Sequence, residues 1–192
     1  MIQKAILQPG GSSVTYYALG ALFIAPLLIG IFMVRTSVDS TDQANQASRD
    51  LASMYAQGVD FSSPANQKIA FRVAEGMGLM LTEGKAVVIL SKLRMVRESD
   101  CAAVPAAQCK NKGYPVIVQR YVLGNARLRT SSFGDPAKID SDSGNVVNWA
   151  TDTTARAREF SMNLKPGEST YAAECYMTGP DSHAGVYSRA MY

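Results

Sequence analysis

The chain has 192 residues, with 19 Lys and Arg against 16 Asp and Glu and a formal net charge of +3 at pH 7. This length allows one domain, or a small domain with an added anchor. No basic block or basic helical face occurs in the sequence, so nucleic acid is not an expected partner.

The first predicted element is an apolar helix near the start of the chain. No charged side chain lies between Lys4 and Arg35, and residues 14–34 are almost all apolar or small. As a helix this run would measure about 31 Å, close to the thickness of the hydrocarbon core of a bilayer. The sequence therefore predicts a membrane-spanning helix over residues 12–35.

Two other interpretations of this run are weaker. A secretory signal peptide has a shorter apolar region followed by a small-x-small cleavage site, whereas a polar helical pattern follows Arg35. A buried core helix is disfavoured because the run is apolar on all sides and the remaining chain is too small to enclose it.

Small residues and one proline interrupt the apolar run. Pro26 would cost about 3 kcal/mol inside a helix in water, but neighbouring helices can compensate for it in a membrane. Gly20 and Gly30 give the helix a partly smooth surface, which allows close contact with another helix. Ordinary membrane composition explains the same glycines equally well, and both interpretations stay open.

Two helices are predicted before the first strand. Ala44, Ala47 and Leu51 recur at helical spacing, so one helix should run from about residue 14 to residue 57 and stop at Gly58. A second helix should begin after Ser63 and end near residue 76, with Ile69, Val73 and Met77 on one face.

The pattern then changes to strands. Four segments are rich in β-branched and aromatic residues or alternate between apolar and polar ones, over residues 85–96, 115–124, 169–178 and 184–192. Residues 131–148 are rich in Ser, Gly, Asp and Asn, which is typical of a long loop. Strands that follow helices predict an α+β domain over residues 36–192 with an antiparallel sheet of about four strands.

The cysteines suggest a disulfide. Cys101 and Cys109 bracket a short segment between two predicted strands, and a bridge there would stabilise the fold by about 2–3 kcal/mol. Pairing of Cys109 with Cys175 is the alternative. A disulfide would place the large part of the chain on an oxidising side of the membrane.

Catalytic and metal sites have little support in the sequence. The single histidine, His183, lies in a Gly/Pro/Asp loop, and there is no CxxC or GxSxG motif, so we expect no catalytic residue, no metal and no cofactor. Asp140, Asp142 and Asn145 resemble a calcium loop only faintly, and a polar turn is favoured. Glu174 could pair with Arg189 across adjacent strands, or lie on an exposed face.

Several of these segments together resemble a known family. A short leader ends in Gly10-Gly11 before the apolar helix, "DQANQASRDLA" continues that helix, and "SDCAAVPAAQC", "PVIVQRYVLGNARLRTSSFG" and "GESTYAAECYM" follow in the β part. The chain resembles the TadE-like minor pilins, or pseudopilins, of Tad (tight adherence) pilus systems, over nearly its whole length. The resemblance implies a leader over residues 1–11 that a prepilin peptidase removes between Gly11 and Ser12.

Tyr16 departs from the pattern of related pilins. It would be the fifth residue after cleavage, where related pilins usually carry Glu to neutralise the amino terminus of a neighbouring subunit. A tyrosine carries no such charge, so the resemblance implies a minor, priming, tip or membrane-resident role.

The resemblance therefore implies a non-enzymatic, pilin-like component of pilus assembly and adhesion in the bacterial inner membrane, with its C-terminal domain in the periplasm. Helix residues Tyr16, Gly20, Pro26 and Gly30 would contact other minor or major pilins. Membrane lipid, the prepilin peptidase and the inner-membrane assembly platform are the other expected partners. The alternative is a membrane-tethered extracytoplasmic ligand-binding or structural domain outside a pilus system.

Overall fold

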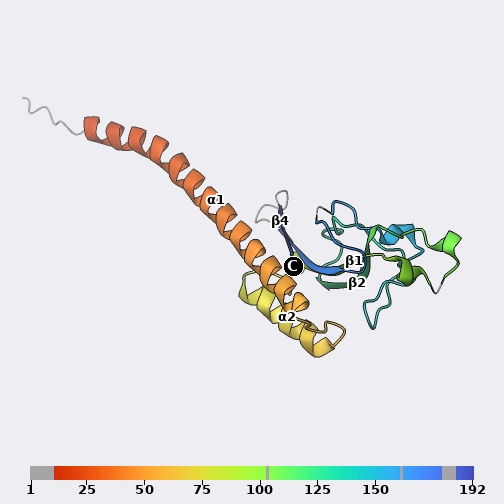
Figure 1. Ribbon diagram of the computed structural model, residues 1–192. Helices are drawn as coiled ribbons and strands as arrows, with labels where there is room; N and C mark the ends of the chain where they lie inside the picture. Colours follow the sequence, from red (N-terminus) through yellow and green to blue (C-terminus); the bar gives the residue numbers. More distant parts are fainter. Residues whose placement is uncertain (1–10, 103, 161, 179–184) are drawn as a thin grey trace, which may run out of the picture. The chain divides into compact units, whose positions relative to one another are not determined.

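The computed structural model describes residues 11–102, 104–160, 162–178 and 185–192, and within these ranges it leaves out the side chains of residues 11–20, 32–33, 36–37 and 106. The chain divides into two units, residues 1–39 and residues 40–192. The main elements in chain order are α1 (Gly11–Ala56), α2 (Pro64–Gly76), β1 (Ala86–Met95), β2 (Pro115–Gly124), β3 (Ser169–Thr178) and β4 (Gly185–Met191) (Figure 1).

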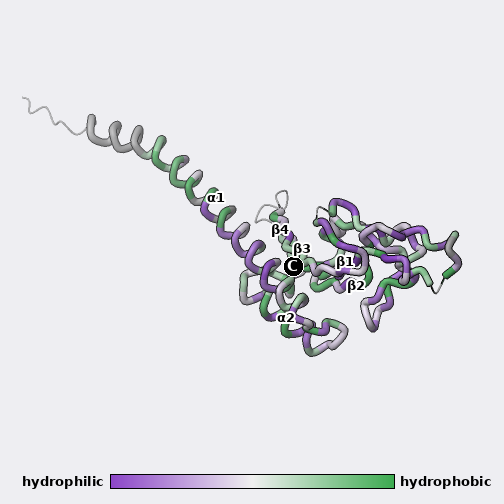
Figure 2. The backbone as a smooth tube through the Cα atoms, in the orientation of Figure 1, coloured by the Kyte–Doolittle hydropathy of each residue, from purple (hydrophilic) through white to green (hydrophobic). Residues whose placement is uncertain are grey.

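The part of α1 in the first unit is apolar. Its coloured segment in Figure 2 is mostly hydrophobic up to about residue 34, after which hydrophilic residues predominate. Pro26 lies inside this helix, where its ring removes one backbone hydrogen bond. The helix that the sequence predicts from about residue 14 to residue 57 is therefore present with nearly these bounds.

The prediction of a membrane-spanning helix over residues 12–35 is wrong for the described structure. No helix in the part of the chain that the structure describes is both long enough and apolar enough to cross a membrane.

The C-terminal part of α1 belongs to the second unit and is amphipathic. Ala44, Ala47, Leu51 and Tyr55 are buried at helical spacing, so one stripe of the helix contributes to the core. The helix ends as predicted, because Gly58 adopts φ +90° and its N–H donates to the carbonyl of Tyr55. A positive φ is a conformation that glycine adopts without steric cost.

Helix α2 begins with Pro64 at its first position, directly after Ser63, as the sequence predicts. The buried face matches the expected one in part.

Of the three residues predicted for that face, Val73 and Met77 pack partly buried against the core, whereas Ile69 is 50% exposed. The fully buried residues of α2 are Ala70 and Ala74. Their small side chains allow the helix to approach the core closely.

The four strands form one antiparallel sheet in the order β2-β1-β3-β4. Their bounds lie within one to two residues of the predicted segments. Strand β1 is central, and its first six residues are buried on both faces. A bulge between Lys92 and Leu93 shifts the register of β1 against β2 and leaves Val118 as the extra residue.

The sheet separates two hydrophobic clusters. The first contains side chains from α1, α2 and the sheet, among them Leu51, Phe61 and Leu90. The second contains side chains from the sheet and the long irregular segment after β2, among them Leu93 and Phe133. The α+β arrangement of residues 40–192 is therefore a helical layer, a sheet and a layer of loops.

Candidate functional site

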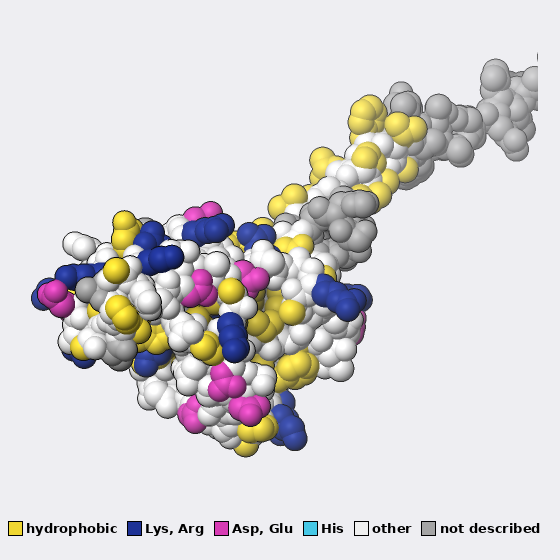
Figure 3. Space-filling view, turned by 90° about the vertical axis from the view of Figure 1, so that its right-hand side faces the viewer, with side chains coloured by type: hydrophobic (Ala, Val, Ile, Leu, Met, Phe, Trp, Pro, Cys, Tyr) yellow, Lys and Arg dark blue, Asp and Glu magenta, His cyan; other side chains and the backbone are white. Residues whose placement is uncertain are grey.

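The first candidate surface is the apolar part of α1. Within residues 21–38 the large apolar side chains with described positions are between 53% and 71% exposed, and they are Leu22, Phe23, Ile24, Leu27, Leu28, Ile29, Ile31, Val34 and Val38. Figure 3 shows hydrophobic side chains along this part of the helix. Contiguous exposed apolar surface of this kind typically marks a binding surface.

The structure describes only some of the residues that the sequence predicts for leader cleavage and for this helix surface. Gly11 begins α1 and Ser12 is its second residue, while Gly10 lies outside the described residues. Tyr16 and Gly20 lie on the helix, but their side-chain surroundings are outside the described part. A Cβ added at Gly30 would meet no atom within 4 Å, so the described chain itself places nothing against this smooth position.

The second candidate surface surrounds a disulfide. Cys101 ends a short 3-10 helix, Glu98–Cys101, and is joined to Cys109 with a Cα–Cα distance of 5.6 Å. This is the bridge that the spacing of the two cysteines predicts. The alternative pairing of Cys109 with Cys175 is wrong, because Cys175 is a free, buried residue of β3. Burial raises the pKa of the Cys175 thiol to about 12, so the thiol stays protonated and unreactive.

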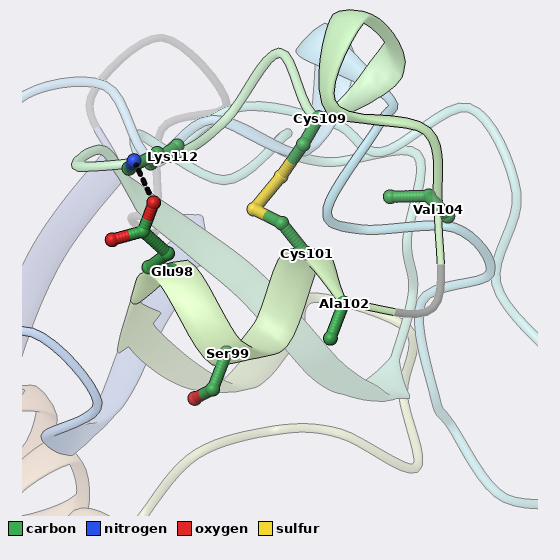
Figure 4. Close-up of a pocket in the computed structure, with 7 residues that line it drawn as sticks. All are labelled: Glu98, Ser99, Cys101, Ala102, Val104, Cys109 and Lys112. Atoms are coloured by element: carbon green, nitrogen blue, oxygen red, sulfur yellow. Dashed lines mark hydrogen bonds and ion pairs between the residues drawn. A yellow bond between two sulfur atoms is a disulfide. The ribbon is translucent and has the colours of Figure 1, made fainter.

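An open cavity of about 710 Å³ lies beside this disulfide (Figure 4). Ala102 and Val104 supply apolar surface, and Lys112 donates to Glu98 over 2.7 Å at the rim. Both members of that ion pair are more than half exposed, so the pair adds little stability. The cavity can hold a small apolar group, but its lining provides no nucleophile with a neighbouring base.

Asp100 ties the disulfide loop to the sheet. Its carboxylate accepts hydrogen bonds from Arg94 Nη2 at 3.0 Å, Arg97 Nε at 3.2 Å and the Arg97 backbone N–H at 3.1 Å. Burial alone would raise the pKa of Asp100, but the Arg97 N–H and the two guanidinium groups outweigh burial and lower it. This role of Asp100 cannot be predicted from the sequence, because the segment "RESDC" (residues 97–101) contains no recognised motif.

Glu174 is the centre of a second polar cluster, on the loop side of the sheet. It lies opposite Arg189 in the β3–β4 register, as predicted, but it is only 2% exposed. Its carboxylate accepts from the Ser132 N–H at 2.8 Å, from Tyr187 Oη at 2.7 Å and from Ser131 Oγ. Among the described residues no ion pair joins Glu174 to Arg189, so the predicted direct pairing and the exposed face are both wrong.

Arg120 is the third member of this cluster, and no pattern in the sequence predicts its role. Its guanidinium is almost fully buried and donates to the Gly134 carbonyl at 2.6 Å, to Ser131 Oγ at 2.9 Å and to Ser91 Oγ at 3.2 Å. Burial lowers the pKa of Arg120, while Glu174 and Asp135 act in the opposite direction. Arg120 and Glu174 together hold residues 131–134 on the sheet, which is a structural task.

A cluster of metal-ligating side chains is not found among the described residues. No group of three or more His, Cys, Asp or Glu side chains in that part of the chain could hold a metal ion, and His183 lies outside it. The Asp140 carboxylate accepts from Ser143 Oγ at 2.5 Å and from the Asp142 N–H at 3.4 Å. These bonds close a polar turn of the kind that the sequence favours over a calcium loop.

Comparisons of the chain with known protein families, with curated proteins and with solved structures found no match.

Proposed function

We propose that this protein is a non-enzymatic, minor pilin-like component of a Tad-type pilus assembly system, which acts in pilus biogenesis and adhesion. The observation that carries the proposal is α1, one continuous helix of 46 residues. Its N-terminal half exposes apolar side chains, and its C-terminal half contributes a buried stripe to a domain with a four-stranded antiparallel sheet. A subunit that assembles through its N-terminal helix needs both parts: an exposed apolar half for contact with partners and a second half that is anchored in its own domain.

The exposed half of α1 is the proposed assembly surface. Burial of one large aliphatic side chain contributes roughly 1.5–3 kcal/mol, so the apolar residues between Leu22 and Val38 favour association with another apolar helix. Other minor or major pilins are the proposed partners on this surface. The prepilin peptidase would act between Gly11 and Ser12, and the assembly platform in the inner membrane would recruit the protein.

The disulfide supports a location for residues 40–192. A Cys101–Cys109 bridge between partly exposed residues persists in an oxidising compartment and is rare in a reducing one. The proposed location of this unit is therefore the periplasm of a bacterium, next to the inner membrane.

Complementation of a deletion strain tests the proposal. We expect deletion to reduce the number of pili per cell, and the double variant Leu27→Lys/Leu28→Lys to fail in restoring it, because two ammonium groups on the assembly surface oppose burial. Ile69→Lys is the control, since Ile69 is a half-exposed apolar residue on α2, outside the assembly surface. Normal pilus number without the protein would exclude the proposal.

A second function has one specific observation in its favour. The cavity of about 710 Å³ beside the disulfide is within the size range of small-molecule sites, which favours an extracytoplasmic ligand-binding domain. This alternative predicts unchanged piliation in the deletion strain, so the same experiment separates the two.

A further inference from the structure

A smaller cavity lies on the sheet near the bulge of β1 and β2. Its volume is about 180 Å³, below the roughly 300–1,000 Å³ of sites for drug-sized ligands. This size suits one small ring or one charged group rather than an extended ligand. The cavity is lined by Lys92, Arg94, Val118, Gln119, Asn145 and Trp149.

The bulge explains why these side chains converge. Lys92 lies opposite Gln119 in the β1–β2 ladder, and the register then shifts so that Val118 is inserted. Bulges commonly redirect side chains beside functional sites. Asn145 belongs to the loop that runs along the free edge of β2, because it forms a bridge with Gln119.

The lining carries an excess of positive charge. The Lys92 ammonium lies 5.3 Å from the centre of the Tyr171 ring and forms no ion pair with a described residue. Arg94 shares the single carboxylate of Asp100 with Arg97. Arg94 Nε is buried and has no hydrogen-bond partner in the described part of the chain. One carboxylate therefore faces three cations in this region.

Two side-chain amides line the cavity, and they differ in how many hydrogen bonds they already make within the protein. Gln119 donates to Tyr121 Oη at 2.7 Å and to the Ser143 carbonyl at 2.9 Å, and it accepts from Tyr55 Oη at 2.7 Å. This amide is therefore held rigidly and can accept one more hydrogen bond. The side-chain amide of Asn145 makes no hydrogen bond with another described residue, so it can both donate and accept.

We propose that this cavity binds a single acidic sugar residue, a hexuronate, at the end of a polysaccharide or free. The Lys92 ammonium binds the carboxylate, with the Arg94 guanidinium adding to the attraction. The amides of Asn145 and Gln119 bind hydroxyl groups, and the indole of Trp149 packs against the apolar face of the sugar ring. The cavity is separate from the helix surface of the proposed function, so the failure of either proposal leaves the other intact.

The protein itself provides the probe for a test. Trp149 is its only tryptophan, so a change in tryptophan fluorescence reports directly on this cavity. We expect glucuronate to change the fluorescence of the full chain with a Kd on the order of 1 mM, the affinity of a ligand this small. Glucose, which lacks the carboxylate, should bind about tenfold more weakly, and acetate, which lacks the ring, should give no saturable change.

Two variants identify the residues responsible. Lys92→Gln should weaken glucuronate binding about tenfold or more, because it removes a charge-assisted hydrogen bond, and Asn145→Ala should weaken glucuronate and glucose alike. Lys165→Gln is the control for Lys92→Gln, since it removes the same charge at an exposed position outside the cavity lining. Unchanged circular dichroism shows that the variants are folded.

Three results would overturn the proposal. In the first, glucuronate does not change the tryptophan fluorescence of the folded protein. The second is an equal response to acetate, which would show a general anion effect. The third is an equal loss of binding in Lys92→Gln and Lys165→Gln, which would show attraction by overall charge.

Discussion

At the scale of single residues, the chain uses two carboxylates to fix loops on its sheet. Glu174 holds residues 131–134 through Ser131 and Ser132, and Asp100 holds the start of the disulfide loop through Arg94 and Arg97. Both carboxylates accept several hydrogen bonds, and removal of such an acceptor leaves buried donors unpaired, which costs roughly 1–3 kcal/mol per group. Both residues therefore contribute to the stability of the fold.

The role of Asp100 predicts a dependence of stability on pH. Its pKa is lowered in the folded protein, so its contribution is complete above the unfolded value of about 3.9 and disappears as the pH falls through the folded value. We expect Asp100→Asn to lower the free energy of unfolding at pH 7 and to have a smaller effect below pH 3. Urea denaturation at both pH values measures this difference.

The matched control for Asp100→Asn is Asp135→Asn, at an exposed carboxylate that lies 3.9 Å from Arg120. Because the Asp135 carboxylate is 79% exposed and therefore strongly screened by water, its interaction with the buried Arg120 should contribute less than about 1 kcal/mol. If Asp100→Asn destabilised the protein equally at both pH values, a loss of packing rather than a loss of charge would be the cause.

At the scale of elements, the polar loop after β2 depends on Gly144. This glycine adopts φ +66°, and its carbonyl accepts from the Arg120 N–H at 2.8 Å along the edge of β2. A Cβ at this position would lie 2.5 Å from the Tyr121 ring and 2.8 Å from the Arg120 carbonyl oxygen. Both the conformation and the contacts therefore require glycine.

Gly144→Ala should therefore destabilise the protein by about 1–3 kcal/mol, measured by thermal or urea denaturation. Gly76→Ala is the control, because Gly76 ends α2 and a Cβ there meets no atom within 4 Å. Gly76→Ala should be neutral or stabilising by up to about 1 kcal/mol. Equal effects of the two substitutions would contradict the steric argument.

The sequence predicts the regular elements well and the loops poorly. Periodicity locates α1, α2 and the four strands because each pattern reflects burial within the element itself. The positions of Glu174 and Arg120 depend on a loop that comes from another part of the chain, and no local pattern contains that information. Likewise, the bulge that places Lys92, Val118 and Gln119 beside one cavity is a property of the pairing between two strands.

The charge-free run is where local pattern and structure disagree most. Its length from Lys4 to Arg35 predicts a membrane span, yet no helix of the described residues meets that requirement. The predicted membrane span covers residues 12–35, and the side chains of residues 11–20 lie outside the described part. The sequence predicts the helical conformation of this run correctly, but a membrane-spanning helix is not found among the described residues.

At the scale of the whole molecule, the proposed function predicts where the mature protein begins. In the sequence Gly10 and Gly11 directly precede Ser12. Under the proposed function, amino-terminal sequencing of protein from cells with an active prepilin peptidase should begin at Ser12. A Gly11→Leu variant should keep Met1, because the peptidase would meet a large side chain at the cleavage site. An intact Met1 in the unmodified protein would contradict this processing.

The order of the strands in the sheet has a consequence for how the protein acquires its fold. Strand β1 occupies a central position, but its two neighbours are β2, from residue 115, and β3, from residue 169. During synthesis β1 therefore emerges with both edges unpaired, and one edge stays so until about 80 further residues have been made. Six consecutive residues of β1 are buried in the finished protein, and an apolar segment that waits unpaired is prone to aggregation. The unpaired edge of β1 is therefore the part of the sheet most exposed to aggregation in the newly made chain, until β3 pairs with it.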